Sequence, residues 1–385
     1  MSSVDRSSEL ARTGGGNVDR RSEPARTAGR NASSREERIL GIIETARAKR
    51  PRFKDPAITM SHGAGGKATQ TLIEGLFVPA YGGETLTAMG DAGAAGDMVM
   101  TTDSFVVKPL RFPGGSIGEL AVNGTVNDLA VAGARPLALT VAMILEEGLD
   151  SGVLRAEVEA IALAAAAAGV EIVAGDTKVV ERGHADQMYL ATTGVGRPDP
   201  RAQLAPQNLR PGDKVLLSGS IGEHGTAIML ARGEFELEAS VESDTRSLWP
   251  VADALLEAAG EGLRCMRDAT RGGVASVLNE LARASSVAMV VREATVPVHP
   301  VVAGAAEILG IDPMYVANEG KLVAFVAPEV ADAALEAMRA VDGCEAAAEI
   351  GEVRTEPPGM VLVETSFGGR RVMDQLVGDP LPRIC

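Results

Sequence analysis

From residue 58 onward, short apolar segments typical of β-strands alternate with longer segments of helical period, several of them rich in alanine. In the first half of this region the predicted strands are 98–102, 137–145, 171–174 and 187–196, and the predicted helices are 117–132, with Ser116 and Glu119 as a capping box, and 153–168, capped by Ser151. Polar residues flank these strands, whereas a doubly wound parallel sheet needs continuous apolar runs. The pattern therefore predicts an α+β fold.

A Pro-rich segment, residues 197–212, separates this region from a second one of similar character. The second region has predicted strands at 214–218, 263–266, 287–291, 322–326, 346–353 and 360–363, and predicted helices at 226–231, 247–259, 272–284 and 330–339. We therefore predict two domains, 55–200 and 201–364. The remaining residues, 365–385, contain several Gly and Pro residues without a sustained period, and we expect a flexible tail there.

The first 54 residues form an Arg-rich head of a different kind. Residues 1–50 contain ten Arg and one Lys against seven acidic residues, so they carry +4, while the whole chain carries −15. Residues 4–13 recur in part fourteen positions later, and the segment has too few apolar residues to offset its ordering entropy. We predict disorder over 1–33 and a short helix over 34–48. The missing aromatic residues and Lys clusters argue against nucleic-acid binding.

The overall composition excludes several other classes. The chain has 385 residues, of which 45% are hydrophobic but only 3% aromatic, so its core must consist of Ala, Val, Leu and Ile. Its three cysteines are too few and odd in number for a disulfide framework, which favours a reduced, cytoplasmic location. No apolar run approaches the roughly 20 residues of a membrane span, and no signal peptide is recognisable at the N-terminus.

Four aspartates in the first domain are candidates for a metal site. Asp91, Asp103 and Asp176 follow predicted strands, at 86–89, 98–102 and 171–174, and Asp128 lies beside Asn127. Carboxylates that converge from different strands are the oxygen ligands that Mg²⁺ prefers. Any one of them is equally explained as a turn or cap residue. Four together favour a site for a metal and a phosphate.

A Gly-rich segment, residues 61–69, is the candidate phosphate loop. It departs from a P-loop, because Ser61 and Ala68 stand where Gly and Ser or Thr are required. Its loose match to a dinucleotide-binding pattern is weak, since only residues 57–60 remain to form the preceding strand. A lid whose backbone N–H groups cover a triphosphate fits better. The alternative is a plain turn without a ligand.

Two pairs of acidic and basic residues fit phosphoryl transfer. Asp176 and Lys178 stand close together in the segment 175–178, where a cation stabilises the transferred charge, although a surface ion pair is the simpler explanation. Glu319 and Lys321 lie before an apolar strand of the second region. Residues 268–273 open a predicted helix with small residues, which makes that N-terminus a candidate anion site.

The last residue of the chain is a cysteine, and its position sets it apart from the other two cysteines. Cys265 and Cys344 lie in apolar patterns typical of inert core thiols, but Cys385 ends the chain after a Gly- and Pro-containing tail. The adjacent α-carboxylate disfavours the thiolate. Such a thiol suits a carrier that another site loads and unloads, whereas a terminal residue without a role is the alternative.

Several motifs together resemble the HypE family of [NiFe]-hydrogenase maturation factors, within the AIR-synthetase-like superfamily of ATP-using enzymes. They occur in the family's order, at 62–66, 102–104, 112–115, 124–129, 175–180, 268–273, 318–321 and 382–385. The similarity extends from about residue 58 to the end. The Arg-rich head lies outside it, and Ala269 replaces a residue that is often bulkier in relatives.

The resemblance implies an AIR-synthetase-like two-domain fold, with an ATP-binding, dimer-forming sheet domain followed by an α/β sandwich domain. It implies a homodimer that receives a carbamoyl group from HypF on Cys385, dehydrates it with ATP to a thiocyanate, and passes cyanide to iron held by HypC and HypD. Family positions would assign Mg²⁺ to Asp91, Asp103, Asp128 and Asp176, ATP to His62, Gly63, Gly65, Gly66, Asn127, Thr177 and Lys178, and catalysis to Cys385, Lys178 and Glu319.

Two other functions remain open at this point. A small-molecule kinase or synthetase of the same superfamily would leave Cys385 incidental. Selenophosphate synthesis is disfavoured, because the first cysteine, Cys265, lies far beyond the Gly-rich segment. A non-catalytic maturation scaffold would not need the combination of acids and lysine.

Overall fold

A computed structural model describes residues 52–233, 240–376 and 383–385. The head predicted to be disordered and the helix predicted over 34–48 lie outside these residues. Residues 51–385 form one compact unit, which contains two main sheets.

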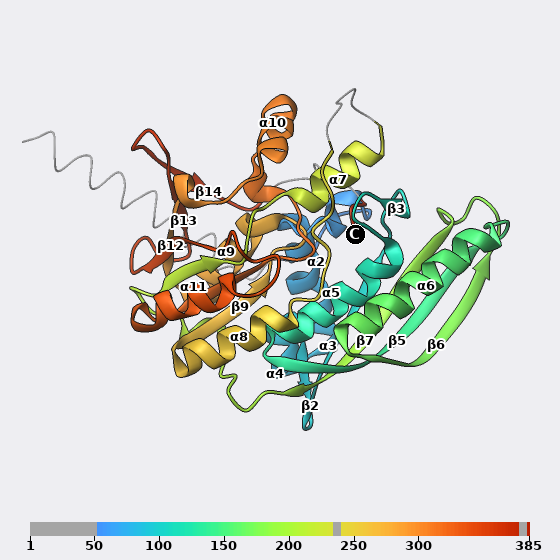
Figure 1. Cartoon of the computed structure of the whole chain (residues 1–385), viewed down its shortest axis with the longest axis horizontal. Coiled ribbons are helices and arrows are strands. Elements are labelled where there is room, and N and C mark those ends of the chain that lie inside the picture. The colour runs from blue at the N-terminus through green and yellow to red at the C-terminus, as the bar shows by residue number, and fades with distance from the viewer. Residues whose placement is uncertain (1–51, 234–239, 377–382) are drawn as a thin grey trace, which may run out of the picture. The chain divides into compact units, whose positions relative to one another are not determined.

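The first sheet has five strands in the order β1-β2-β7-β5-β6, and only the contact between β5 and β6 is parallel. The strands are β1 (Gly93–Ala95), β2 (Met98–Phe105), β5 (Ala134–Glu146), β6 (Glu171–Val180) and β7 (Met188–Pro198). Helices α5 (Ile117–Val131) and α6 (Ser151–Ala168) pack beside each other along this sheet (Figure 1). Strand β6 lies at one edge and is exposed along almost its whole length.

The second sheet has seven strands in the order β14-β13-β10-β12-β8-β11-β9, with β10 and β13 parallel. Its strands are β8 (Lys214–Leu217), β9 (Leu263–Asp268), β10 (Ala288–Arg292), β11 (Leu322–Val326), β12 (Ala348–Arg354), β13 (Val361–Glu364) and β14 (Arg370–Met373).

Helices cover both faces of the second sheet. Alternate residues of β11 enter different cores: Val323 and Phe325 pack with α9 (Gly273–Ser285), and Leu322 and Ala324 pack with α8 (Trp249–Ala259) and α11 (Ala331–Arg339). Successive side chains of a strand point to opposite faces, so a central strand covered on both sides must be apolar throughout. This explains why every residue of β11 is buried.

The remaining elements are short or peripheral. They are η1 (Met60–Gly63), α2 (Lys67–Leu72), the π-helix η2 (Ile73–Phe77), α3 (Val78–Tyr81), α4 (Glu84–Thr87), β3 (Arg111–Phe112), β4 (Gly115–Ser116), η3 (Pro206–Asn208), α7 (Glu223–Ala231), η4 (Gly260–Gly262), η5 (Glu293–Thr295), α10 (Pro300–Leu309), η6 (Pro313–Tyr315) and η7 (Pro328–Val330). Among the described residues, no helix has the length and apolar character needed to cross a membrane.

The α+β fold predicted from the sequence is confirmed, but several local predictions are wrong. Asp150, not Ser151, caps α6, because its carboxylate accepts hydrogen bonds from the N–H groups of residues 152 and 153. The side chain of Ser116 makes no capping hydrogen bond to α5. Residues 84–87 form helix α4 where a strand was expected at 86–89.

The tail is more ordered than predicted. Residues 370–373 form β14, which pairs with β13, so the second sheet extends past the expected domain end. At the terminus, Ile384 is only 5% exposed and belongs to a core that includes residues of the first sheet and of α5. A flexible tail over all of 365–385 is therefore incorrect, because apolar burial and backbone hydrogen bonds hold parts of it in place.

Candidate active site

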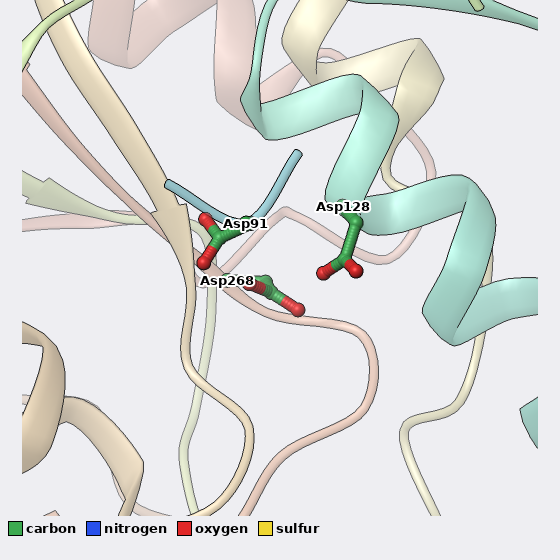
Figure 2. A group of neighbouring side chains, drawn as sticks. All are labelled: Asp91, Asp128 and Asp268. Atoms are coloured by element: carbon green, nitrogen blue, oxygen red, sulfur yellow. The ribbon is translucent and has the colours of Figure 1, made fainter. Parts of the chain in front are cut away.

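Three carboxylates from separate elements converge near the junction of the two sheets. Asp91 lies in the loop before β1, Asp128 lies in α5, and Asp268 ends β9 (Figure 2). Each contributes an oxygen, and these oxygens lie within 4.8 Å of one another. Oxygen ligands gathered from different elements in this way match the requirements of a divalent cation such as Mg²⁺.

Hydrogen bonds and an ion pair hold this cluster in place. The hydroxyl of Thr101 lies 2.7 Å from Oδ2 of Asp128 and 2.9 Å from the carbonyl oxygen of Asp91. The guanidinium of Arg267 forms an ion pair with Asp91 and donates to the carbonyl oxygen of Met89 at 2.8 Å. Since Arg267 belongs to β9, this contact ties the loop of the first sheet to the second.

The carboxylates of the cluster repel one another, and the nearby positive charge of Arg267 offsets this repulsion only in part. Burial and the nearby charges of Asp268 and Asp91 raise the pKa of Asp128 well above its usual range. Burial and the charge of Asp91 raise the pKa of Asp268 to about 8. A cation bound between the carboxylates would remove this repulsion, so the donor set fits Mg²⁺.

Asp103 lies next to the cluster but outside it. Its Oδ1 accepts a hydrogen bond from the N–H of Ser104 at 2.7 Å and lies 3.9 Å from Nη2 of Arg271. The charge of Asp103 contributes to the raised pKa values of Asp128 and Asp268, so it acts on the same site.

Glu319 is a buried carboxyl beside this site. It is 3% exposed, and its Oε1 has no hydrogen-bond partner among the described residues. Burial and the charge of Asp103 raise its pKa well above the usual range. The carboxylate of Asp244 holds the backbone, accepting from the N–H groups of Glu319 and Gly320 at 3.1 Å each and from Nζ of Lys321 at 3.0 Å. The result is a fixed carboxyl with the capacity to accept a proton.

Asn127 supports Glu319 from the side of α5. Its amide donates to the carbonyl oxygens of Arg246 at 3.0 Å and of Glu319 at 3.2 Å, and accepts from the N–H of Leu248 at 2.7 Å. The side chain that was predicted to bind ATP thus makes its hydrogen bonds within the chain, and it positions the segment that carries Glu319.

The Gly-rich segment forms one wall of a cavity of about 350 Å³. Within the Gly-rich segment, the side chain of His62 is buried. Its Nδ1 accepts a hydrogen bond from the N–H of Thr59 at 3.0 Å, and its Nε2 lies 2.9 Å from Oδ2 of Asp55. Both ring nitrogens therefore orient the segment itself. Gly65 has a φ of +73°, and a Cβ there would lie 2.8 Å from the carbonyl oxygen of Arg271, so this close approach requires glycine. Gly66, which caps the N-terminus of α2, is buried.

Arg271 and the end of the chain line the same cavity. Arg271 donates to the carbonyl oxygen of Gly63 at 2.9 Å. Cys385 is half-buried and lines the same cavity, and its negative charge is the main reason that the pKa of Arg271 is raised. Arg271 therefore connects the Gly-rich segment, Asp103 and the C-terminal residue.

Both halves of this architecture match known protein families. Residues 83–197 match the N-terminal domain of the AIR synthase related proteins, and residues 210–363 match their C-terminal domain. The carbamoyl dehydratase HypE of Bradyrhizobium diazoefficiens is 49% identical over 337 residues, which cover 86% of this chain and 97% of that protein.

The chain belongs to the HypE family.

Two solved structures of HypE proteins support this assignment. A HypE in complex with HypF is 44% identical, with a TM-score of 0.77 and coverage of 79% of this chain and 99% of that one. A HypE in complex with ATP is 42% identical, with a TM-score of 0.72 and coverage of 86% and 100%. The AIR-synthetase-like fold implied by the sequence motifs is thus confirmed.

Three residues predicted for the HypE site lie elsewhere in this chain. Asp176, Thr177 and Lys178 are exposed on β6, where Nζ of Lys178 donates to Oδ2 of Asp176 at 2.6 Å. Strand β2, which carries Asp103, is separated from β6 by β7 and β5. Three strand spacings amount to about 14 Å. Asp176, predicted as a metal ligand together with Asp91, Asp103 and Asp128, therefore lies apart from them within one copy of the chain, and Asp268 lies beside Asp91 and Asp128 instead.

Asp268, Asp244 and Arg271 are the residues that the sequence analysis missed or assigned differently. Asp268 was noted only as part of a helix N-terminus. Its position at the end of a predicted strand, the same signal that singled out Asp103, also indicated a ligand. No sequence signal distinguished Asp244, because its role depends on contacts with residues 319–321. Cys265 and Cys344 are buried as predicted, and burial raises the pKa of Cys265 to about 12.

Proposed function

We propose that this HypE-family chain uses ATP to dehydrate a carbamoyl group carried on the thiol of Cys385, which forms a thiocyanate. The observation that carries the proposal is the position of the chain's own end. Cys385 lines the cavity formed with the Gly-rich segment and Arg271, and Arg271 also faces Asp103 beside the acidic cluster. In a kinase whose C-terminal residue has no role in the reaction, the chemistry would not require Cys385 to lie in this cavity.

The two substrates would meet in this cavity. A relative that is 42% identical has been solved in complex with ATP, and here His62, Gly63 and Ala64 of the Gly-rich segment line the same cavity as Cys385. We assign Asp91, Asp128 and Asp268 to Mg²⁺, with Asp103 nearby. When bound, the ion neutralises phosphate charge during phosphoryl transfer. Arg271 supplies a further positive charge next to the terminus.

The proposed reaction moves one oxygen from carbon to phosphorus. The carbamoyl oxygen attacks the γ-phosphorus of ATP, and ADP leaves with the electrons of the broken P–O bond. Glu319 accepts one N–H proton, and the second proton is lost as the C–O bond breaks and phosphate departs. The carbon and nitrogen remain on sulfur as S–C≡N. Burial raises the pKa of Glu319 well above its usual range, which makes its carboxylate a stronger base than an exposed one and suits the role of proton acceptor.

The proposed chemistry needs partners that load and unload the terminus. Cys385 is only half-exposed when docked, so the terminus must leave the cavity to be loaded. The twelve residues after β14 can span at most about 40 Å. We propose that HypF, which is bound to a HypE in a solved complex, supplies the carbamoyl group, and that a HypC–HypD complex accepts the cyanide.

A protein mass measurement tests the proposal. The chain is loaded by HypF and a carbamoyl donor, Mg-ATP is added, and the C-terminal peptide is weighed. We expect an adduct on Cys385 that loses the mass of one water only when ATP is present. With a heavy oxygen isotope in the carbamoyl group, the isotope should appear in phosphate. An adduct that never loses water, or an unlabelled phosphate, would contradict the proposed reaction.

Removal of one metal ligand should weaken the effect of Mg²⁺ on stability. In the wild type, Mg²⁺ relieves the repulsion among the carboxylates, so we expect the melting temperature to rise with Mg²⁺ concentration. Asp128→Asn removes one charge, and the apparent affinity for Mg²⁺ should fall about 10- to 100-fold. Thermal melts at increasing Mg²⁺ measure both. The matched control, Asp332→Asn on the exposed side of α11, should behave as wild type, and an equal response of all three proteins would argue against the assigned ligands.

The family resemblance predicts a homodimer, and β6 is the surface that we assign to it. This strand is ten residues long, and on its outer side it has no partner strand among the described residues. Its exposed side chains include Ile172, Val173 and Val179. A long exposed edge with apolar side chains favours pairing with a second copy. Asp176, Thr177 and Lys178 would then act at the site of the other copy.

Mixing two inactive variants tests this arrangement. Lys178→Ala and Glu319→Gln should each lose activity when assayed alone. If Lys178 acts across the dimer, co-expressed chains of the two kinds contain one intact site per mixed dimer, and about a quarter of the wild-type activity should return under random pairing. A matched mixture of Lys178→Ala chains with Asp128→Asn chains should be rescued in the same way. Failure of both mixtures, in proteins shown to be dimeric, would show that Lys178 does not act at the site of the other copy.

A further inference from the structure

The last three residues are held through their backbone as well as their side chains. The N–H of Val106 donates to an oxygen of the terminal carboxylate of Cys385 at 3.1 Å, and the N–H of Lys108 donates to the carbonyl oxygen of Arg383 at 3.3 Å. Arg232 donates from Nη2 to the carbonyl oxygen of Arg383 at 2.6 Å. The terminus thus runs along the segment that continues β2.

The carbonyl between these two is held by a buried histidine. Nε2 of His224, in the first turn of α7, lies 2.6 Å from the carbonyl oxygen of Ile384, and the His224 ring is fully buried. It makes a T-shaped contact with the ring of Phe112, with centroids 5.5 Å apart. The hydrogen bond therefore lies inside the protein, next to the buried side chain of Ile384.

The tautomer of this histidine follows from its two partners. A carbonyl oxygen only accepts, so Nε2 must carry the proton. Nδ1 lies 2.8 Å from the hydroxyl of Ser243, and that oxygen already accepts from the N–H of Thr245 at 3.2 Å. The Ser243 hydroxyl can therefore donate to Nδ1 of a neutral ring. Burial, which lowers the pKa of His224, agrees with the neutral form.

We infer that His224 is a positioning residue for the reaction at Cys385. By donating from Nε2 to the carbonyl oxygen of Ile384, His224 fixes the position of the backbone that carries Cys385 into the cavity. The hydroxyl of Ser243 keeps the His224 ring in the tautomer that has its proton on Nε2. This inference rests on the proposed function of Cys385 as the carrier. His224 does not line the cavity around Cys385, so it acts through the backbone of the terminus.

Alkylation of Cys385 measures the position of the terminus without any catalysis. The full chain is treated with iodoacetamide, and the C-terminal peptide is followed by mass spectrometry. Asn at position 224 is too short to reach Ile384, so His224→Asn should increase the alkylation rate about tenfold, the expected effect of losing one buried hydrogen bond. Gln places an amide nitrogen near the position of Nε2, so His224→Gln should stay within about threefold of wild type.

A matched control and a second variant keep the test decisive. His299→Asn, at the N-cap of α10, should leave the rate unchanged. If His224→Asn gives no cooperative melt, Ser243→Ala replaces it, and this variant should increase the rate about threefold because the tautomer is no longer fixed. An unchanged alkylation rate in the folded variant would overturn the positioning role.

Kinetics separate this inference from the proposed function. In carbamoyl-loaded chains with ATP, His224→Asn should lower the rate constant of water loss about tenfold and leave KM for ATP within about twofold, since the residue acts only on the placement of the terminus. A changed KM with an unchanged rate constant would contradict the positioning role. If the wild type loses no water while alkylation still responds to position 224, the proposed function fails and the docking of the terminus stands.

Discussion

Replacement of Cys385 by serine is expected to abolish carbamoyl loading and thiocyanate formation, a loss of at least about 10⁴-fold, because a serine hydroxyl is a far weaker nucleophile than a cysteine thiolate. The contacts that hold the terminus are made by backbone groups, by Ile384 and by the side chain of Arg383, which forms an ion pair with Asp186, so the variant should still dock. ATP affinity, measured by calorimetry, should remain near that of wild type.

The chain offers a matched control for this substitution. Cys344→Ser exchanges the same atoms at a buried position whose sulfur accepts a hydrogen bond from Nη2 of Arg246 at 2.9 Å. Its loading and water loss should equal those of wild type. ATP-dependent phosphate release that persists in Cys385→Ser with a small-molecule acceptor would favour a superfamily kinase instead.

The second large effect is expected from Glu319→Gln, which should lower the rate of water loss about 10³-fold, within the range seen for loss of a general base. Gln keeps the volume of the side chain and leaves the backbone bonds to Asp244 intact, so the variant should fold and bind ATP. Carbamoyl-loaded chains should then accumulate in the presence of Mg-ATP, which mass spectrometry detects directly.

The role of Glu319 as the base also predicts how the rate of water loss changes with pH. Burial raises the pKa of Glu319, so its carboxyl loses the proton at a higher pH than an ordinary glutamate does. Because only the deprotonated carboxylate can act as the base, the wild-type rate should increase as the pH rises through this titration. Glu319→Gln should lack this increase. The exposed Glu345→Gln is the control and should keep the wild-type profile, and a Glu319→Gln rate within threefold of wild type would exclude the residue as the base.

The sequence did not predict which of Asp268 and Asp176 lies beside Asp91 and Asp128. Both follow or interrupt apolar segments, and both belong to motifs that resemble the HypE family. The choice between them depends on strand order: β9 ends beside the loop of Asp91, whereas β6 lies at the far edge of the first sheet. Local periodicity contains no information on which strands become neighbours.

The sequence by itself determined the α+β class, the strands and helices with strong periodicity, and the family motifs, because these depend on residues close together in the chain. Only the tertiary structure decided that Asp91, Asp128 and Asp268 form one cluster, and that His224 and Val106 hold a terminus 160 and more residues away. Such contacts form through packing of distant segments, and their energies depend on the burial that the complete fold provides.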